Sequence, residues 1–355
     1  MAEANDPKNT QGVVYEPIQT MPWFSEAWSQ WIQLCQRLGH AYLYSGPQGI
    51  GLEDFAKQAA HYVLCRNHDK KQTLQQACDE CQSCHLFITQ QHPDFFELRR
   101  LQDKKEITVD QVRDLVYKLN ETSHQGGYKV IWIDGVEFLN QSAFNALLKN
   151  LEEPAANTLF LLTTHQIDRL PATIKSRCQQ LNFTAPPLLE AIDWVRNQAP
   201  QADEALVKRS LRLNWGAPID ALNWIDAALF EEDQQWKNDL KLMQTGKKTV
   251  TQGVSEWLKW QAPERVFDYF YQWSISAVRS VAYADHQDLP IGGNESIQNW
   301  LRFQQAVLNA KQSWLSNANK ELVLENLCLE WLNIQISAEP LKTVFKSKLQ
   351  KGKLA

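Results

Sequence analysis

The stretch that most constrains the fold is residues 41–53, AYLYSGPQGIGLE, in which a short apolar run leads into a glycine-rich loop. A helical pattern follows at residues 54–60. This order of strand, glycine-rich loop and helix is the context that a phosphate-binding loop requires. The stretch therefore predicts the first strand and helix of a nucleotide-binding type of α/β domain. The glycines of the loop are Gly46, Gly49 and Gly51.

Two groups that would bind a nucleotide are missing after the last glycine. Leu52 stands where the pattern needs a lysine for the β- and γ-phosphates, and Glu53 stands where a hydroxyl would hold magnesium. A carboxylate about 4 Å from a phosphate charge would be repelled by roughly 4 kcal/mol at the effective dielectric near a protein surface. The sequence therefore predicts an ATPase scaffold whose own nucleotide site is degenerate.

A third group of a working nucleotide site is missing after a later predicted strand. Residues 128–134, YKVIWID, form a continuous apolar run that ends in Asp134, as expected for a buried strand of a parallel sheet with an acid at its carboxyl end. This is the Walker B position, and in working ATPases of this class a glutamate follows the aspartate to polarise the attacking water. Here Gly135 follows, so the Walker B motif is degenerate as well.

Alternating strand and helix patterns complete the predicted domain. Together with the two strands above, three further strands alternate with helices, which predicts a doubly wound, parallel five-stranded α/β sheet. The further strands are expected at 92–98, 158–164 and 179–183, and helices at 22–38, 107–115 and 140–153.

Prolines and changes in the sequence pattern divide the chain into five expected parts. Pro186 and Pro187 mark the hinge after the sheet domain, and beyond about residue 231 the pattern is all helical. The parts are an N-terminal arm at 1–21, a base domain at 22–186 with an insertion at 65–84, a helical lid at 187–230, an all-α domain at 231–340 and a basic tail at 341–355.

Four of the seven cysteines lie in the insertion. Two overlapping CxxC pairs can close a tetrahedral zinc site with Zn–S bonds near 2.3 Å, and a reducing cytosol disfavours disulfides. With four thiolates no coordination position is left for water, so we expect zinc in a structural role. The expected ligands are Cys65, Cys78, Cys81 and Cys84.

Charge and hydropathy limit the partners. The 355 residues carry a formal net charge of -5 with pI ≈ 5.9, which argues against a chain that grips nucleic acid by itself. No apolar run approaches the roughly 18 residues of a membrane span, and the start lacks a signal-peptide pattern. We therefore expect a cytoplasmic protein without membrane contact. A zinc-dependent nucleic-acid module remains an alternative, although acidic residues offset the basic ones around the cysteines.

Several motifs stand out along the chain: GPQGIG at 46–51, the four-cysteine insertion, HPD at 92–94, NALLKNLEEP at 145–154 and SRC at 176–178. Together they resemble the AAA+ clamp-loader family. The resemblance is strong across about residues 38–187, and the degenerate phosphate loop narrows it to the bacterial DNA polymerase III delta-prime branch. A weaker match at 318–325 is similar to the family's C-terminal collar.

The resemblance implies a non-hydrolysing stator subunit of a five-subunit ring that loads the sliding clamp at primed DNA. Its partners would be delta and gamma/tau-type subunits, the clamp and primer-template DNA, within a DNA polymerase III holoenzyme. It implies that residues 231–340 form an oligomerisation collar and that Arg177 reaches a neighbour's ATP site as an arginine finger. Where active relatives carry a nucleotide-sensing arginine, this chain has Ile219. An active AAA+ ATPase that uses unusual groups stays open as an alternative.

Overall fold

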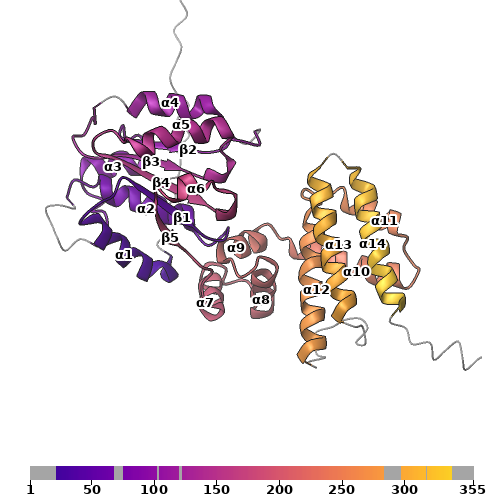
Figure 1. Ribbon diagram of the computed structural model, residues 1–355. Helices are drawn as coiled ribbons and strands as arrows, with labels where there is room; N and C mark the ends of the chain where they lie inside the picture. Colours follow the sequence, from indigo (N-terminus) through magenta and orange to yellow (C-terminus); the bar gives the residue numbers. More distant parts are fainter. Residues whose placement is uncertain are drawn as a thin grey trace, which may run out of the picture. The chain divides into compact units, whose positions relative to one another are not determined.

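The structure, a computed structural model, describes residues 21–67, 75–101, 104–119, 122–283, 297–316 and 318–337 (Figure 1). The predicted arm, except for Met21, and the predicted basic tail lie outside these residues. The described residues form two compact units, one drawn from residues 1–195 with 216–220 and the other from residues 196–215 with 221–355.

The first unit is built on a five-stranded parallel sheet with the strand order β2-β3-β4-β1-β5 (Figure 1). This confirms the predicted fold class, including the five strands. The strands are β1 (Ala41–Ser45), β2 (Phe95–Leu98), β3 (Lys129–Ile133), β4 (Thr158–Thr164) and β5 (Gln179–Asn182). The helices of this unit are α1 (Ser25–Cys35), α2 (Leu52–Leu64), α3 (Gln82–Ile88), α4 (Val109–Leu119), α5 (Gln141–Glu152), α6 (Ala172–Lys175) and most of α7 (Leu188–Gln198).

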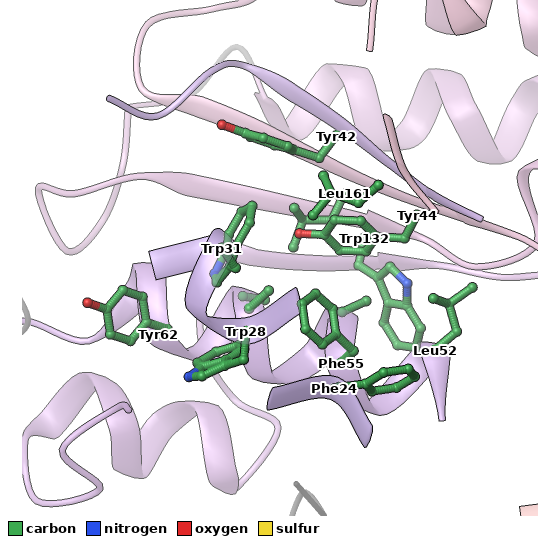
Figure 2. Packing of buried hydrophobic residues seen from close by; sticks show 14 of the residues in the cluster. Phe24, Trp28, Trp31, Tyr42, Tyr44, Leu52, Phe55, Tyr62, Trp132 and Leu161 are labelled. Atoms are coloured by element: carbon green, nitrogen blue, oxygen red, sulfur yellow. The ribbon is translucent and has the colours of Figure 1, made fainter. Parts of the chain in front are cut away.

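Both faces of the sheet are buried, because alternate residues of each central strand enter opposite cores. Tyr42 and Tyr44 pack with α1 and α2, whereas Ala41 and Leu43 pack with α4 and α5. On the first face the ring of Tyr44 meets that of Phe55 edge-to-face at 5.3 Å (Figure 2). Such aromatic pairs add about 0.5–1.5 kcal/mol each beyond the area they bury.

The sheet register brings the ends of β1 and β4 together. Ser45 pairs with Thr164, so the loop that starts at Gly46 lies beside the residue that follows β4, His165. Asp134 follows β3, the other neighbour of β4. Because parallel strands end at the same edge of a sheet, the glycine-rich loop, Asp134 and His165 share this edge.

The second unit is helical, as the sequence predicts for the C-terminal region. Its core is rich in tryptophan, and Trp236, Trp257, Trp300 and Trp331 each expose 1% or less of their surface. The helices are α8 (Glu204–Leu213), most of α9 (Pro218–Asp226), α10 (Phe230–Gln244), α11 (Val250–Trp257), α12 (Arg265–Tyr283), α13 (Ile297–Leu315) and α14 (Lys320–Ser337).

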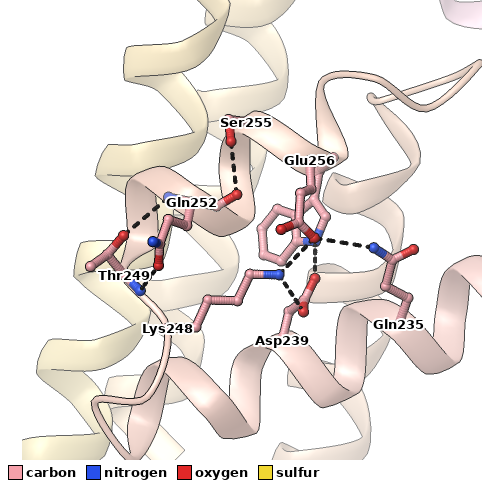
Figure 3. Close-up of polar contacts among 8 residues, drawn as sticks. Gln235, Asp239, Lys248, Thr249, Gln252, Ser255 and Glu256 are labelled. Atoms are coloured by element: carbon pink, nitrogen blue, oxygen red, sulfur yellow. Dashed lines mark hydrogen bonds and ion pairs between the residues drawn. The ribbon is translucent and has the colours of Figure 1, made fainter.

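A polar network ties α10 to α11 in this unit (Figure 3). The Nζ of Lys248 lies 2.7 Å from Asp239 Oδ1 and 2.7 Å from Glu256 Oε2. The indole N–H of Trp257 donates to the other oxygen of Asp239 at 2.9 Å. Asp239 is only 3% exposed, so its buried charge has both a cation and a neutral donor.

The finer division into base domain, lid and collar remains a prediction. The two compact units place α8 with the C-terminal helices, whereas the predicted lid at 187–230 groups α7, α8 and α9 together. Among the described residues, none of the helices is long and apolar enough to cross a membrane.

Candidate functional site

The glycine-rich loop adopts the backbone shape that its glycines allow. Gly49 and Gly51 have φ angles of 73° and 90°, in the left-handed region that glycine enters without steric cost. Helix α2 begins directly after Gly51, at Leu52. Leu52 is fully buried in the core between α1, α2 and the sheet (Figure 2). The position that would carry the phosphate-binding lysine therefore contributes an apolar side chain to that core.

Glu53 is paired with His165, a residue that the sequence analysis missed. The Nε2 of His165 lies 2.8 Å from Glu53 Oε1, and its Nδ1 lies 3.0 Å from the carbonyl oxygen of Gly46. The carbonyl accepts, and so does the carboxylate when Glu53 is ionised, in which case both ring nitrogens carry hydrogen and the imidazole is a cation. The ion pair thus joins the loop, the start of α2 and the end of β4.

The titration behaviour of the pair agrees with this geometry. Burial alone would lower the pKa of His165, but its hydrogen bonds to Glu53 and Gly46 raise it to about 9. Burial alone would raise the pKa of Glu53, but the hydrogen bond from His165 lowers it below its ordinary value. The group in the magnesium position is therefore a carboxylate that is already neutralised from within the chain.

Two further acids stand near Glu53. Burial, together with the charge of Glu53, raises the pKa values of Asp134 and Asp220 above the ordinary value. Asp134 accepts a hydrogen bond from the hydroxyl of Thr163 at 3.1 Å. The predicted Walker B acid and Asp220 therefore lie within electrostatic reach of Glu53 at this edge of the sheet.

The segment 216–220, which belongs to the first unit, closes over the loop. A Cβ on Gly49 would lie 2.3 Å from Asp220 Cγ, so the Asp220 carboxyl group sits directly against this glycine. The backbone N–H of Ile219 donates to the carbonyl of Gly49 at 3.0 Å. Ile219 occupies the position where active relatives are expected to carry a nucleotide-sensing arginine. Its Cδ1 also packs near Gly51.

The N-terminal side of the unit covers the loop as well. The indole N–H of Trp23 donates to the carbonyl of Ile50 at 3.0 Å. Met21 packs on Gly51, where an added Cβ would lie 2.8 Å from the Met21 side chain. Gly49, Ile50 and Gly51 are thus buried beneath protein atoms of the same unit.

The backbone at Gly135, directly after Asp134, leaves no room for the glutamate that working ATPases carry there. Gly135 has a φ of 69°, and a Cβ there would lie 2.6 Å from the ring of Phe138. A glutamate at this place would require both a strained backbone and a shift of the ring. Glu137, two residues later, instead accepts a hydrogen bond from the backbone N–H of His165 at 3.1 Å.

The four predicted metal-binding cysteines come together. All four sulfur atoms lie within 4.8 Å of one another, and those of Cys78 and Cys84 are 3.9 Å apart. Four sulfurs bound to one zinc ion at about 2.3 Å would stand about 3.8 Å from each other. Burial alone would raise the pKa of Cys78, but the backbone N–H groups of Glu80 and Cys81 lower it to about 6. The donor set and its spacing fit a tetrahedral metal site.

The cysteine cluster is anchored to the first unit through α2 and α3. Cys65 directly follows α2, and Cys81 caps α3 by accepting the N–H of Cys84. Between them, the hydroxyl of Ser83 donates to the carbonyl of Leu64 at 2.5 Å and contacts Nε2 of His92 at 2.8 Å. Through Ser83 the insertion is therefore hydrogen-bonded to the end of α2 and to His92, just before β2. The sequence analysis did not predict α3.

Arg177, the predicted arginine finger, precedes β5, which the sheet order places at an edge. Its Nη2 lies 2.5 Å from Glu152 Oε1, and its Nη1 donates to the carbonyl of Thr173 at 2.9 Å. The side chain is 33% exposed. Arg177 is thus a held but accessible cation at the sheet edge.

The sequence matches known proteins over most of its length. Residues 25–187 match the family described as "DNA polymerase III, delta subunit". The chain is 32% identical to DNA polymerase III subunit delta' of Pseudomonas aeruginosa over 325 residues, which are 88% of this chain and 97% of that protein. It is 36% identical to subunit delta' of Escherichia coli, with 55% of each chain covered.

A likeness to a second type of subunit is also present. The chain is 31% identical to DNA polymerase III subunit tau of Bacillus subtilis over 217 residues, 60% of this chain and 37% of that protein. The match to the Pseudomonas protein, however, extends through both compact units. The chain belongs to the family of DNA polymerase III delta' subunits.

Proposed function

We propose that this chain is a non-hydrolysing stator subunit of a bacterial clamp loader, which helps place the sliding clamp on primed DNA. Its partners are delta and gamma/tau-type subunits in a hetero-oligomer, together with the clamp and primer-template DNA as part of the complex. Membership of the delta' family and likeness to a tau subunit support a place in such a complex.

One observation carries the non-hydrolysing part of the proposal, namely the self-closed phosphate loop. Glu53 is neutralised by His165, Asp220 sits on Gly49, and Leu52 is buried in the core. A nucleotide would have to break the ion pair, displace the 216–220 segment and approach a group of acids. This supports the stator over an ATPase that uses unusual groups.

Arg177 supplies the active contribution in this proposal. A guanidinium suits the charge that develops on a transferred phosphoryl group, and arginine fingers contribute on the order of 10³–10⁵ in rate at the site they serve. The position before the edge strand β5 and the partial exposure of Arg177 support a contact with a neighbouring subunit. A surface arginine held by a carboxylate for stability alone would contribute only about 0–1 kcal/mol.

The test is an Arg177→Ala subunit reconstituted with the other loader subunits. We expect normal assembly, reduced clamp- and DNA-stimulated ATP hydrolysis, and a larger loss of clamp loading. The loss in total hydrolysis stays far below the single-site value, because the remaining ATP sites of the ring keep their own fingers. The matched control is Arg169→Ala, which removes an exposed arginine just before α6, the short helix that Arg177 follows. Unchanged hydrolysis and loading with Arg177→Ala would return this residue to a structural role.

We further propose that Cys65, Cys78, Cys81 and Cys84 hold one structural zinc ion. The ion would supply four strong bonds that join the end of α2 to α3 in a segment with little apolar packing of its own. The sulfur spacing supports this proposal.

A further inference from the structure

We propose that Glu152 is a positioning residue for Arg177, fixing its guanidinium in the orientation from which it meets a neighbour's phosphate. This inference rests on the proposed role of Arg177 in trans. It concerns how the finger is prepared within its own subunit before a partner is bound.

The contacts hold the guanidinium from two directions. Glu152 Oε1 accepts from Nη2 at 2.5 Å, and the carbonyl of Thr173 accepts from Nη1 at 2.9 Å. Nη1 also lies 3.5 Å from the hydroxyl of Ser176. Because the guanidinium is planar, partners on two of its nitrogens define the orientation of the whole group. It carries five N–H donors, which is more than these contacts use.

Glu152 is itself held by a rigid element. It is the last residue of α5, and its neighbour Leu151 is 1% exposed in the core between α5 and the sheet. Phe144 and Leu147 on the same helix are buried in that core as well. A group that orients a functional side chain is most effective when its own backbone cannot move. The end of α5 provides such a support.

Stability does not account for the pair. The two side chains are 33% and 48% exposed, and ion pairs of this kind contribute about 0–1 kcal/mol. A free arginine side chain, in contrast, carries about 2 kcal/mol of rotamer entropy that is lost when it is ordered at a phosphate. Ordering the side chain in advance removes part of that cost from the catalytic encounter.

The experiment uses the complete reconstituted loader and follows clamp- and DNA-stimulated ATP hydrolysis. Glu152→Ala should lower the Arg177-dependent part of kcat roughly three- to tenfold, since small misplacements of a catalytic group have large effects on rate. KM for ATP should not change, because ATP is bound by the neighbour. Glu152→Gln should retain most of the activity, because its amide oxygen still accepts from Nη2. Glu153→Ala, at the adjacent exposed position, is the control.

A double variant decides whether Glu152 acts through Arg177. In the Arg177→Ala background, Glu152→Ala should have no further effect on kcat. The positioning role is overturned if Glu152→Ala lowers kcat equally with and without Arg177, or has no effect in the wild-type background. The proposed role of Arg177 as an arginine finger is unaffected by either result. If Arg177→Ala itself has no effect, the proposed role of Arg177 in trans fails, and this inference with it.

Discussion

At the scale of single residues, side chains from distant parts of the sequence meet at the glycine-rich loop. His165 brings a cation to the carboxylate of Glu53, at the position where a working loop holds magnesium. The carbonyl of Gly46 receives the second N–H of the same ring. The end of β4, the loop and the start of α2 are thus joined by one internal ion pair.

This account predicts a pH dependence. The pKa of His165 is raised from 6.5 to about 9, so protonated His165 contributes fully at about pH 6.5 and loses its contribution as the pH rises through about 9. In acid the pair is lost as well, when Glu53, whose pKa lies below its ordinary value of 4.5, becomes protonated. We expect His165→Asn to be less stable than the wild type by on the order of 2 kcal/mol near pH 6.5, with the gap closing by about pH 9.5. Urea unfolding of both proteins at each pH measures this gap.

The control for that experiment is His40→Asn, which alters an exposed histidine just before β1. Groups common to all three proteins cancel when variants are compared at the same pH. A gap between His165→Asn and wild type that stays constant from pH 6.5 to about 9.5 would contradict an ionised His165.

At the scale of elements, the cysteine insertion is a small module fastened to α2 and β2. Its own apolar core is limited, so the metal should provide much of its order. We expect one zinc per chain by metal analysis. Cys81→Ser should lose the metal and increase hydrogen exchange across residues 75–91, because one of the four metal–sulfur bonds is removed while a serine hydroxyl can still cap α3.

The second unit should be unaffected by that change, because it has its own hydrophobic core. Cys35→Ser, which alters a half-buried thiol outside the cluster, is the control for general effects of a lost sulfur. Protein purified without chelators that contains no zinc would refute the metal prediction.

The elements also show what sequence reasoning can and cannot reach. The strand, loop and helix around Gly46 could be predicted, because residues near in sequence determine them, and the CxxC pairs fix their ligands by spacing. The ion pair of Glu53 with His165 spans more than a hundred positions and depends on the register of β1 with β4. The contact of Asp220 with Gly49 depends on how segment 216–220 folds back. No local pattern carries either contact.

At the scale of the whole molecule, the chain consists of two units, each with its own hydrophobic core. The first contains the closed loop, the cysteine cluster and Arg177, and the second is an all-helical body with a tryptophan-rich core. Units with separate cores should respond independently to mutation.

The Lys248 network tests this independence. Lys248→Met leaves Asp239 buried beside Trp257 without its cation, and removing one partner of a buried pair costs about 3 kcal/mol. We expect the variant to destabilise the second unit alone, while hydrogen exchange in strands β1 to β5 stays at the wild-type level. Lys247→Met, at the adjacent exposed position, should change neither unit. Equal loss of protection in both units would contradict their independence.

The central claim is that this subunit contributes to hydrolysis without binding nucleotide itself, and ATP titration of the isolated chain in a calorimeter tests it most directly. A gamma/tau-type subunit in the same buffer with magnesium serves as the positive control. We predict that the chain binds ATP no more tightly than about 1 mM, or −4 kcal/mol, and that Leu52→Lys, which places a charge in the core, does not restore turnover. Micromolar binding of ATP by the wild-type chain would contradict the closed loop and the stator role built on it.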